Sequence, residues 1–184
     1  MTLKTKALSF LSTIVFMLTS LFTFSQWTQK TNFGGSARTD AVGFSIGTKG
    51  YIGTGVSGGV FQSDFWEYDP TLNTWTQKAS FPGSARSSAI GFSVGSKGYL
   101  GTGVDQFGWN VDVYEYDPST NSWTQKADFP GTNRSDAVGF SIGSKGYVGT
   151  GFGSGNCYND FYEYDPATDT WTQKADLPAI IRRH

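Results

Sequence analysis

Seven side chains in this sequence have the type and spacing to contact a ligand. Three are arginines that recur every 48 residues, and four are aromatic residues in segments that differ between copies of a repeat. They are Arg38, Arg86, Arg134, Phe61, Phe107, Trp109 and Tyr158. A guanidinium group has five N–H donors, which can serve a ligand or neighbouring loops. Because the arginines recur with the period, we expect them mainly to bond neighbouring loops. The aromatic side chains suit ligand binding and the covering of sheet ends equally well.

Residues for acid–base or metal chemistry are scarce. The only histidine is His184, the last residue, which excludes a Ser/His/Asp triad and a metal site with several histidine ligands. The sequence also has no Asp-x-Asp-x-Asp-Gly calcium loop and no phosphate-binding glycine loop before a helix. Asp64, Asp112 and Asp160 recur before a predicted strand, where we expect them to form turns. We therefore expect no cofactor and no metal, and we favour a protein that is not an enzyme.

The tetrapeptide Trp-Thr-Gln-Lys sets the period. It starts at Trp27, Trp75, Trp123 and Trp171, always 48 residues apart. A constant interval of about 20–50 residues is typical of proteins in which one supersecondary unit is copied and stacked. We expect Trp75 and Trp123 to pack between neighbouring units.

The first 25 residues are predicted to be a secretory signal peptide. Lys4 and Lys6 precede a mostly apolar segment at 7–24, and Thr23 and Ser25 are small residues before a cleavage site at Gln26. The alternative is a membrane anchor, since 18 residues approach the length that spans a bilayer. After cleavage the chain would have no stable membrane span. We expect a secreted or cell-envelope protein, periplasmic or extracellular.

Charge and cysteine content narrow the partners. Without its first 25 residues the chain has 12 basic and 15 acidic residues, a net charge of −3. Because it has no basic stripe and no basic amphipathic helix, we expect no nucleic acid or membrane-surface partner. Cys157 is the only cysteine, so an internal disulfide is excluded. It is either a buried small apolar residue, which we favour, or a free thiol able to pair between molecules.

Each repeat is predicted to form a four-stranded antiparallel meander. In the third copy the strands are predicted at 136–142, 147–151, 160–164 and 171–174, separated by a glycine turn, a variable segment and an Asp-Pro turn. The glycines of the second strand are expected where another backbone approaches closely. The variable segments are 56–63, 104–111 and 152–159. Such sheets can bury both faces by stacking around an axis, as in a β-propeller.

At these residues the chain resembles the kelch-repeat family. The resemblance rests on Tyr-Asp-Pro followed after a short turn by Trp, on an Arg in the next loop, and on a glycine-rich second strand, and it covers residues 27–182. The second strands end in Gly-Thr-Gly, where the family commonly has Gly-Gly. The resemblance implies an all-β, kelch-type β-propeller. Galactose oxidase, a copper enzyme on such a propeller, uses histidine and cysteine–tyrosine ligands that this chain lacks.

The number of repeats predicts an incomplete ring. An N-terminal closing strand at 27–30 precedes three four-stranded blades, at about 35–79, 84–127 and 132–175. Propellers have about 4–8 blades, so three cannot close. Either the chain is a fragment of a longer protein, which we favour, or several copies form a homo-oligomer that completes the ring. Arg182 falls at the arginine position of the next loop.

Function is predicted on one side of the blades. Loops after the second and fourth strands of a meander emerge on the same side, and they hold the arginines and the variable segments. Loops on a rigid scaffold commonly carry function, so we expect this face to bind a protein or a glycan. The resemblance suggests an alternative, a sugar-modifying enzyme similar to the kelch-type sialic acid mutarotases, with Arg and acidic residues in a central pocket. A purely structural repeat protein is the third hypothesis.

Overall fold

The computed structural model describes residues 27–178, so the predicted signal peptide and Arg182 lie outside the described residues. The chain divides into two units, residues 1–30 and 31–184, and every strand belongs to the second unit. Residues 27–30 were expected to form a closing strand, but they lie outside every strand. The described residues contain no helix, and hence none that is long and apolar enough to cross a membrane.

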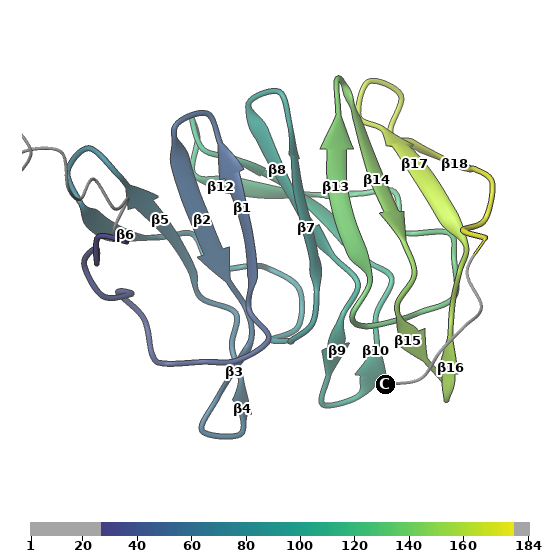
Figure 1. The fold of residues 1–184 in the computed structure, drawn as a ribbon, viewed down its shortest axis with the longest axis horizontal. Helices are drawn as coiled ribbons and strands as arrows, with labels where there is room; N and C mark the ends of the chain where they lie inside the picture. The colour runs from purple at the N-terminus through teal and green to yellow at the C-terminus, as the bar shows by residue number, and fades with distance from the viewer. Residues whose placement is uncertain (1–26, 179–184) are drawn as a thin grey trace, which may run out of the picture. The chain divides into compact units, whose positions relative to one another are not determined.

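The second unit consists of three four-stranded antiparallel sheets, one from each repeat (Figure 1). The first sheet holds β1 (Val42–Ile46), β2 (Lys49–Gly53), β5 (Phe65–Asp69) and β6 (Thr74–Lys78). The second holds β7 (Ile90–Val94), β8 (Lys97–Gly101), β11 (Val113–Asp117) and β12 (Ser122–Lys126). The third holds β13 (Val138–Ile142), β14 (Lys145–Gly149), β17 (Phe161–Asp165) and β18 (Thr170–Gln173). Within each sheet these strands are paired in chain order, as the meander predicts.

The connection between the first two strands is tighter than predicted. The expected four-residue glycine turn is a two-residue turn, because Lys49 pairs with Ile46 and Gly50 pairs with Ser45 within the ladder. Gly47 takes a φ of 58° at this turn, in the left-handed region where glycine is favoured. Two-residue hairpin turns commonly require positive φ, because their twist then matches that of the flanking strands.

The Gly-Thr-Gly segments let two backbones approach closely. A Cβ atom on Gly101 would lie 2.5 Å from the carbonyl oxygen of Asp112, and one on Gly103 would lie 2.6 Å from that of Ser87. Thr102, between these glycines, is fully buried and has a φ of 54°. The prediction that the glycines mark close backbone approach is confirmed.

The core lies between consecutive sheets and is mainly aromatic. Phe65 of the first sheet meets Tyr116 and Trp123 of the second, each at a ring-centroid distance of 4.9 Å. The indole N–H of Trp123 also donates to the carbonyl oxygen of Ala79, which follows the last strand of the first sheet, at 2.8 Å. Trp171 makes the equivalent bond to Ala127 at 3.0 Å. The prediction that Trp123 packs between neighbouring units is therefore confirmed.

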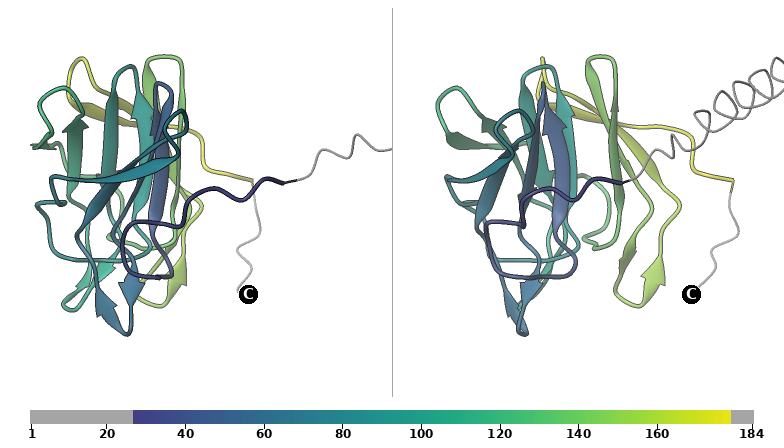
Figure 2. Two further views of the ribbon diagram at one scale, coloured as in Figure 1. Left: turned by 90° about the vertical axis from the view of Figure 1, so that its left-hand side faces the viewer. Right: turned by 60° about the vertical axis from the view of Figure 1, so that its left-hand side comes forward.

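The innermost strands of the three sheets, β1, β7 and β13, lie next to one another in this order, and the sheets stand side by side in the turned views of Figure 2. Short hairpins project from one end of the sheets, at the bottom of Figure 1. The Asp-Pro turns lie at the opposite end, because they connect the strands in the other direction. Two different loop surfaces result.

Candidate functional site

The variable segments fold as short hairpins. They are β3 (Val56–Ser57) with β4 (Val60–Phe61), β9 (Val104–Asp105) with β10 (Gly108–Trp109), and β15 (Phe152–Gly153) with β16 (Asn156–Cys157). The sequence analysis expected variable loops and missed these hairpins. The signal was present in the first copy, where Gly58 and Gly59 stand between two short segments and take φ values of 56° and 81°.

Each hairpin is fixed to the arginine loop of its own repeat. The amide and carbonyl of Thr39 exchange hydrogen bonds of 3.0 and 2.9 Å with Val56. Ser87 pairs with Val104 and Ser135 with Phe152 in the same way. We call the three hairpins and these loops (residues 34–39, 82–87 and 130–135) the hairpin face.

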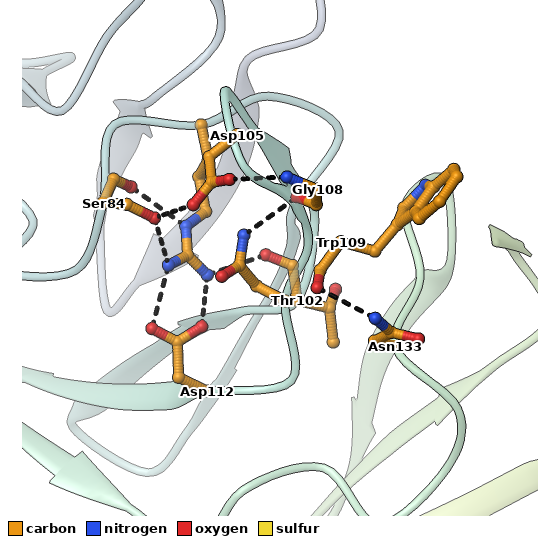
Figure 3. Close-up of polar contacts among 9 residues, drawn as sticks. Ser84, Thr102, Asp105, Gly108, Trp109, Asp112 and Asn133 are labelled. Atoms are coloured by element: carbon orange, nitrogen blue, oxygen red, sulfur yellow. Dashed lines mark hydrogen bonds and ion pairs between the residues drawn. The ribbon is translucent and has the colours of Figure 1, made fainter. Parts of the chain in front are cut away.

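Arg86 is the centre of the polar network shown in Figure 3. Its two terminal nitrogens donate to both carboxylate oxygens of Asp112, the second at 2.8 Å. Its remaining donors reach the carbonyl oxygen of Thr102 at 2.9 Å and the carbonyl and hydroxyl oxygens of Ser84, both at 3.0 Å. All five N–H donors are thus used within the chain. The guanidinium also stacks over the ring of Phe81, 4.9 Å from its centroid.

The other two arginines repeat this arrangement. Arg38 binds both carboxylate oxygens of Asp64, at 2.5 and 2.8 Å, and Arg134 binds those of Asp160, at 2.5 and 2.7 Å. Both also donate to the carbonyl of a Gly-Thr-Gly threonine. The expectation that the arginines bond neighbouring loops is confirmed. The expectation that the aspartates form turns is wrong, because each carboxylate pairs with the arginine 26 residues before it.

Electrostatics keep the acidic groups of this face ionised. The hydrogen bonds from Arg38 outweigh burial and hold the pKa of Asp64 below its usual range. Burial would raise the pKa of Asp105, but bonds from the Ser84 hydroxyl (2.5 Å) and the amides of Phe107 (2.7 Å) and Gly108 (3.0 Å) lower it overall. Figure 3 shows Asp105 bridging the arginine loop and the hairpin. Asp105 therefore holds the hairpin turn in place.

The predicted aromatic residues differ in their surroundings. Phe107 is 85% exposed at the tip of its hairpin, whereas Phe61 and Trp109 are half-buried. Tyr158 covers the guanidinium of Arg134 at 4.3 Å and donates its hydroxyl hydrogen to the carbonyl of Gly153 at 2.9 Å. Tyr158 thus serves the loop structure, and Phe61 and Phe107 are better placed for a ligand.

A hollow of about 390 Å³ opens on the hairpin face. It lies between hairpin β3–β4, the arginine loop of the second repeat and hairpin β9–β10. Its lining residues are Gly59, Val60, Phe61, Ser84, Ala85 and Gln106. Of these, the sequence analysis selected only Phe61, since the others come together from two repeats. The volume lies in the lower part of the range of small-ligand sites, about 300–1,000 Å³.

Metal-binding chemistry has little support in residues 27–178. No three of their His, Cys, Asp and Glu side chains gather in a way that could hold a metal ion. Cys157 is a half-buried free thiol on β16, so it is less buried than the favoured interpretation expected.

Comparison with known proteins agrees with the sheet arrangement. Residues 146–178 match the profile of the Kelch motif. A solved structure described as "Structure of YjhT" superposes with a TM-score of 0.73 over 85% of this chain. The three sheets are blades of a kelch-type β-propeller. In the residues described here the ring of blades is not closed.

The kelch-type likeness is one of fold. YjhT is 20% identical to this chain, and the matched region spans 57% of its length. A search of curated proteins by sequence found no match. The function therefore has to be argued from the hairpin face itself.

Proposed function

We propose that this chain is a binding module whose hairpin face recognises a glycan or a protein ligand. The observation that carries the proposal is the hollow beside Phe61, which is built from segments that differ between otherwise similar repeats. Constant blades support these variable segments. A rigid scaffold with varied loops is a common arrangement in binding proteins.

The arginine pairs support a preorganised face. Arg86 and Arg134 are at most 1% exposed, and each joins the loop before the first strand to the residue before the third strand. The loops beside the hollow are therefore fixed before a ligand arrives. Preorganisation reduces the entropy lost on binding.

The lining of the hollow favours a glycan. Phe61 and Val60 supply an apolar wall, and the exposed Gln106 can supply an amide donor and acceptor. A pocket that combines apolar walls with a few polar groups is typical of small-ligand sites. A single sugar residue at the end of a glycan is of a size to enter it.

A glycan array probed with the purified chain tests this proposal. We expect binding to a restricted set of glycans, weakened about tenfold or more by Phe61→Ala and Gln106→Ala, which remove about 1.4 kcal/mol or more of binding free energy. Leu72→Ala is the matched control, since Leu72 is 69% exposed on an Asp-Pro turn at the other end of the sheet. Wild-type binding by both hollow variants contradicts the proposal. Capture of a protein, lost in both variants, would assign the ligand to proteins instead.

The sugar-modifying alternative has less support. An arginine that acts on a substrate needs free donors, whereas Arg86 directs all five to its own chain. We also propose that the module acts outside the cytoplasm, secreted or in the cell envelope. This rests on the charge and hydropathy pattern of residues 1–25.

A further inference from the structure

The contact between consecutive blades has a repeated geometry. Val42, Phe44 and Ile46 of β1 face the second blade at positions where that blade has glycine. A Cβ atom on Gly91 would lie 2.4 Å from Val42, and one on Gly98 would lie 2.3 Å from Phe44. The apolar side chains of one blade thus occupy space that glycine leaves on the next.

The second and third blades make the same contact. Ile90 and Phe92 of β7 are 1% and 3% exposed. Phe92 would lie 2.2 Å from a Cβ atom on Gly146, and Ile90 would lie 3.3 Å from one on Gly139. Two successive interfaces therefore use the same positions.

Both halves of this contact are also present at the two ends of the array, without a neighbour among the described residues. Val138, Phe140 and Ile142 of β13 are 55%, 40% and 63% exposed, although β13 and β1 have the identical sequence VGFSI. At the other end, Gly43 and Gly50 of the first blade have open space. A Cβ atom on either would meet nothing closer than 3.6 Å.

Backbone groups between blades also form a series. The Ser88 amide donates to the Asp40 carbonyl at 3.0 Å, and the Asp136 amide donates to the Ser88 carbonyl at 3.1 Å. The next bond of the series would join the Asp40 amide of a following blade to the Asp136 carbonyl. The two ends therefore carry complementary polar groups beside the apolar contact.

Trp75 gives a second, independent sign at the first blade. Its indole nitrogen is buried and has no hydrogen-bond partner among the described residues, whereas Trp123 and Trp171 donate to Ala79 and Ala127. The acceptor in each pair is the residue that follows the last strand of the preceding blade. In the third blade that residue is Ala175.

We propose that the β13 face of one copy docks on the β1–β2 face of a second copy, and that the same contact on the other side closes a ring. Three blades fall below the range of about 4–8 found in propellers, two copies give six, and three copies give nine. A second copy is thus the occupant that the geometry of this chain fits. The contact is apolar and is built from residues that already pack this way twice within the chain.

The molar mass of the purified 184-residue chain, measured by light scattering over a wide concentration range, tests the ring. We expect twice the mass of one chain. Gly50→Leu is the decisive variant, since its side chain has room in a single chain but would meet Phe140 of the docked copy, as Gly98 meets Phe44. It should halve the mass and leave the circular dichroism spectrum unchanged. Phe140→Asp should do the same from the other side.

Leu72→Asp is the matched control, because it adds the same charge at an exposed apolar residue away from both faces, and it should keep the doubled mass. A wild-type chain that stays monomeric overturns the proposal. An open series of masses that grows with concentration also overturns it, because a closed ring has no free face. A Gly50→Leu protein that keeps the doubled mass does so as well.

Discussion

At the scale of residues, the constant parts of the hairpin face are the pairs Arg38–Asp64, Arg86–Asp112 and Arg134–Asp160. The arginine side chains are at most 3% exposed, and the aspartates keep about a fifth of their surface in water. A buried guanidinium whose five donors are used is costly to remove, because its partners lose their bonds and stay buried. These pairs therefore determine whether the loops keep their shape.

Arg86→Ala should destabilise the chain by about 3 kcal/mol, in the range found when one partner of a buried ion pair is removed. A urea unfolding curve measures this. Lys174→Ala is the matched control, because it breaks the more exposed pair between Lys174 and Glu163, where about 0–1 kcal/mol is expected. Equal costs for the two substitutions would show that the Arg86 network is not a structural clamp.

The carboxylate of Asp64 makes stability depend on acid. Its pKa in the folded chain lies below the ordinary value of 3.8, mainly because of the hydrogen bonds from Arg38. The unfolded chain thus takes up this proton first as pH falls, so the stabilisation is present above the unfolded pKa and is lost as pH falls through the folded one. Asp64→Asn should reduce the decrease of the thermal midpoint between about pH 5 and about pH 2. Asp128→Asn, at an exposed aspartate, should leave that decrease unchanged.

At the scale of elements, the sequence predicted the four-stranded meander well, because glycine turns, Asp-Pro turns and the Trp strand recur at fixed distance. The strand ends were displaced, since Lys49 and Gly50 join the ladder instead of the turn. The hairpins were missed because two-residue strands have too short a pattern to recognise. The hollow was missed because Phe61 and Gln106 lie in different repeats, and only the packing of two blades brings them together.

Trp123 connects two blades, so its strand should be sensitive to truncation. Trp123→Ala removes a ring that packs on Phe65 and a hydrogen bond to Ala79. We expect a cost of about 3–5 kcal/mol, as for other large aromatic residues in cores. Thr124→Ala, at the exposed next residue of β12, should cost well under 1 kcal/mol. An unchanged unfolding midpoint for Trp123→Ala would place this side chain on the surface.

The N-terminal segment is the element whose role rests on sequence alone. Its two lysines, apolar stretch and small residues before Gln26 predict removal during export. Mass spectrometry of the protein recovered from the culture medium or the cell envelope should find a chain that begins at Gln26. Substituting Ser25 with a large charged residue should block this processing. Recovery of the exported wild-type chain with Met1 intact would contradict the prediction.

At the scale of the whole molecule, the arrangement separates the parts that hold the blades together from the parts that vary. Aromatic contacts and the Trp–carbonyl bonds lie between the blades, whereas the hairpin tips extend beyond the sheets. Val56 and Phe61 anchor the first hairpin by pairing with each other, and Val56 also pairs with Thr39. The tip between these anchors can therefore change without disturbing the blades.

Exchange of a hairpin tip tests this separation. Residues 57–60 (Ser-Gly-Gly-Val) can be replaced by the four residues at the same place in the second hairpin, 105–108 (Asp-Gln-Phe-Gly), and Ser36 stands where Ser84 bonds Asp105. The free energy of unfolding should change by less than about 1 kcal/mol, since no blade contact is altered. Ligand binding should fall at least as far as in Phe61→Ala, because the exchange removes Gly59 and Val60 from the wall of the hollow. The reverse exchange, in the second hairpin, should remove Gln106 and have the same effect. A large loss of stability with either exchange would mean that the hairpins are part of the scaffold, and the binding face would then have to be sought elsewhere on the blades.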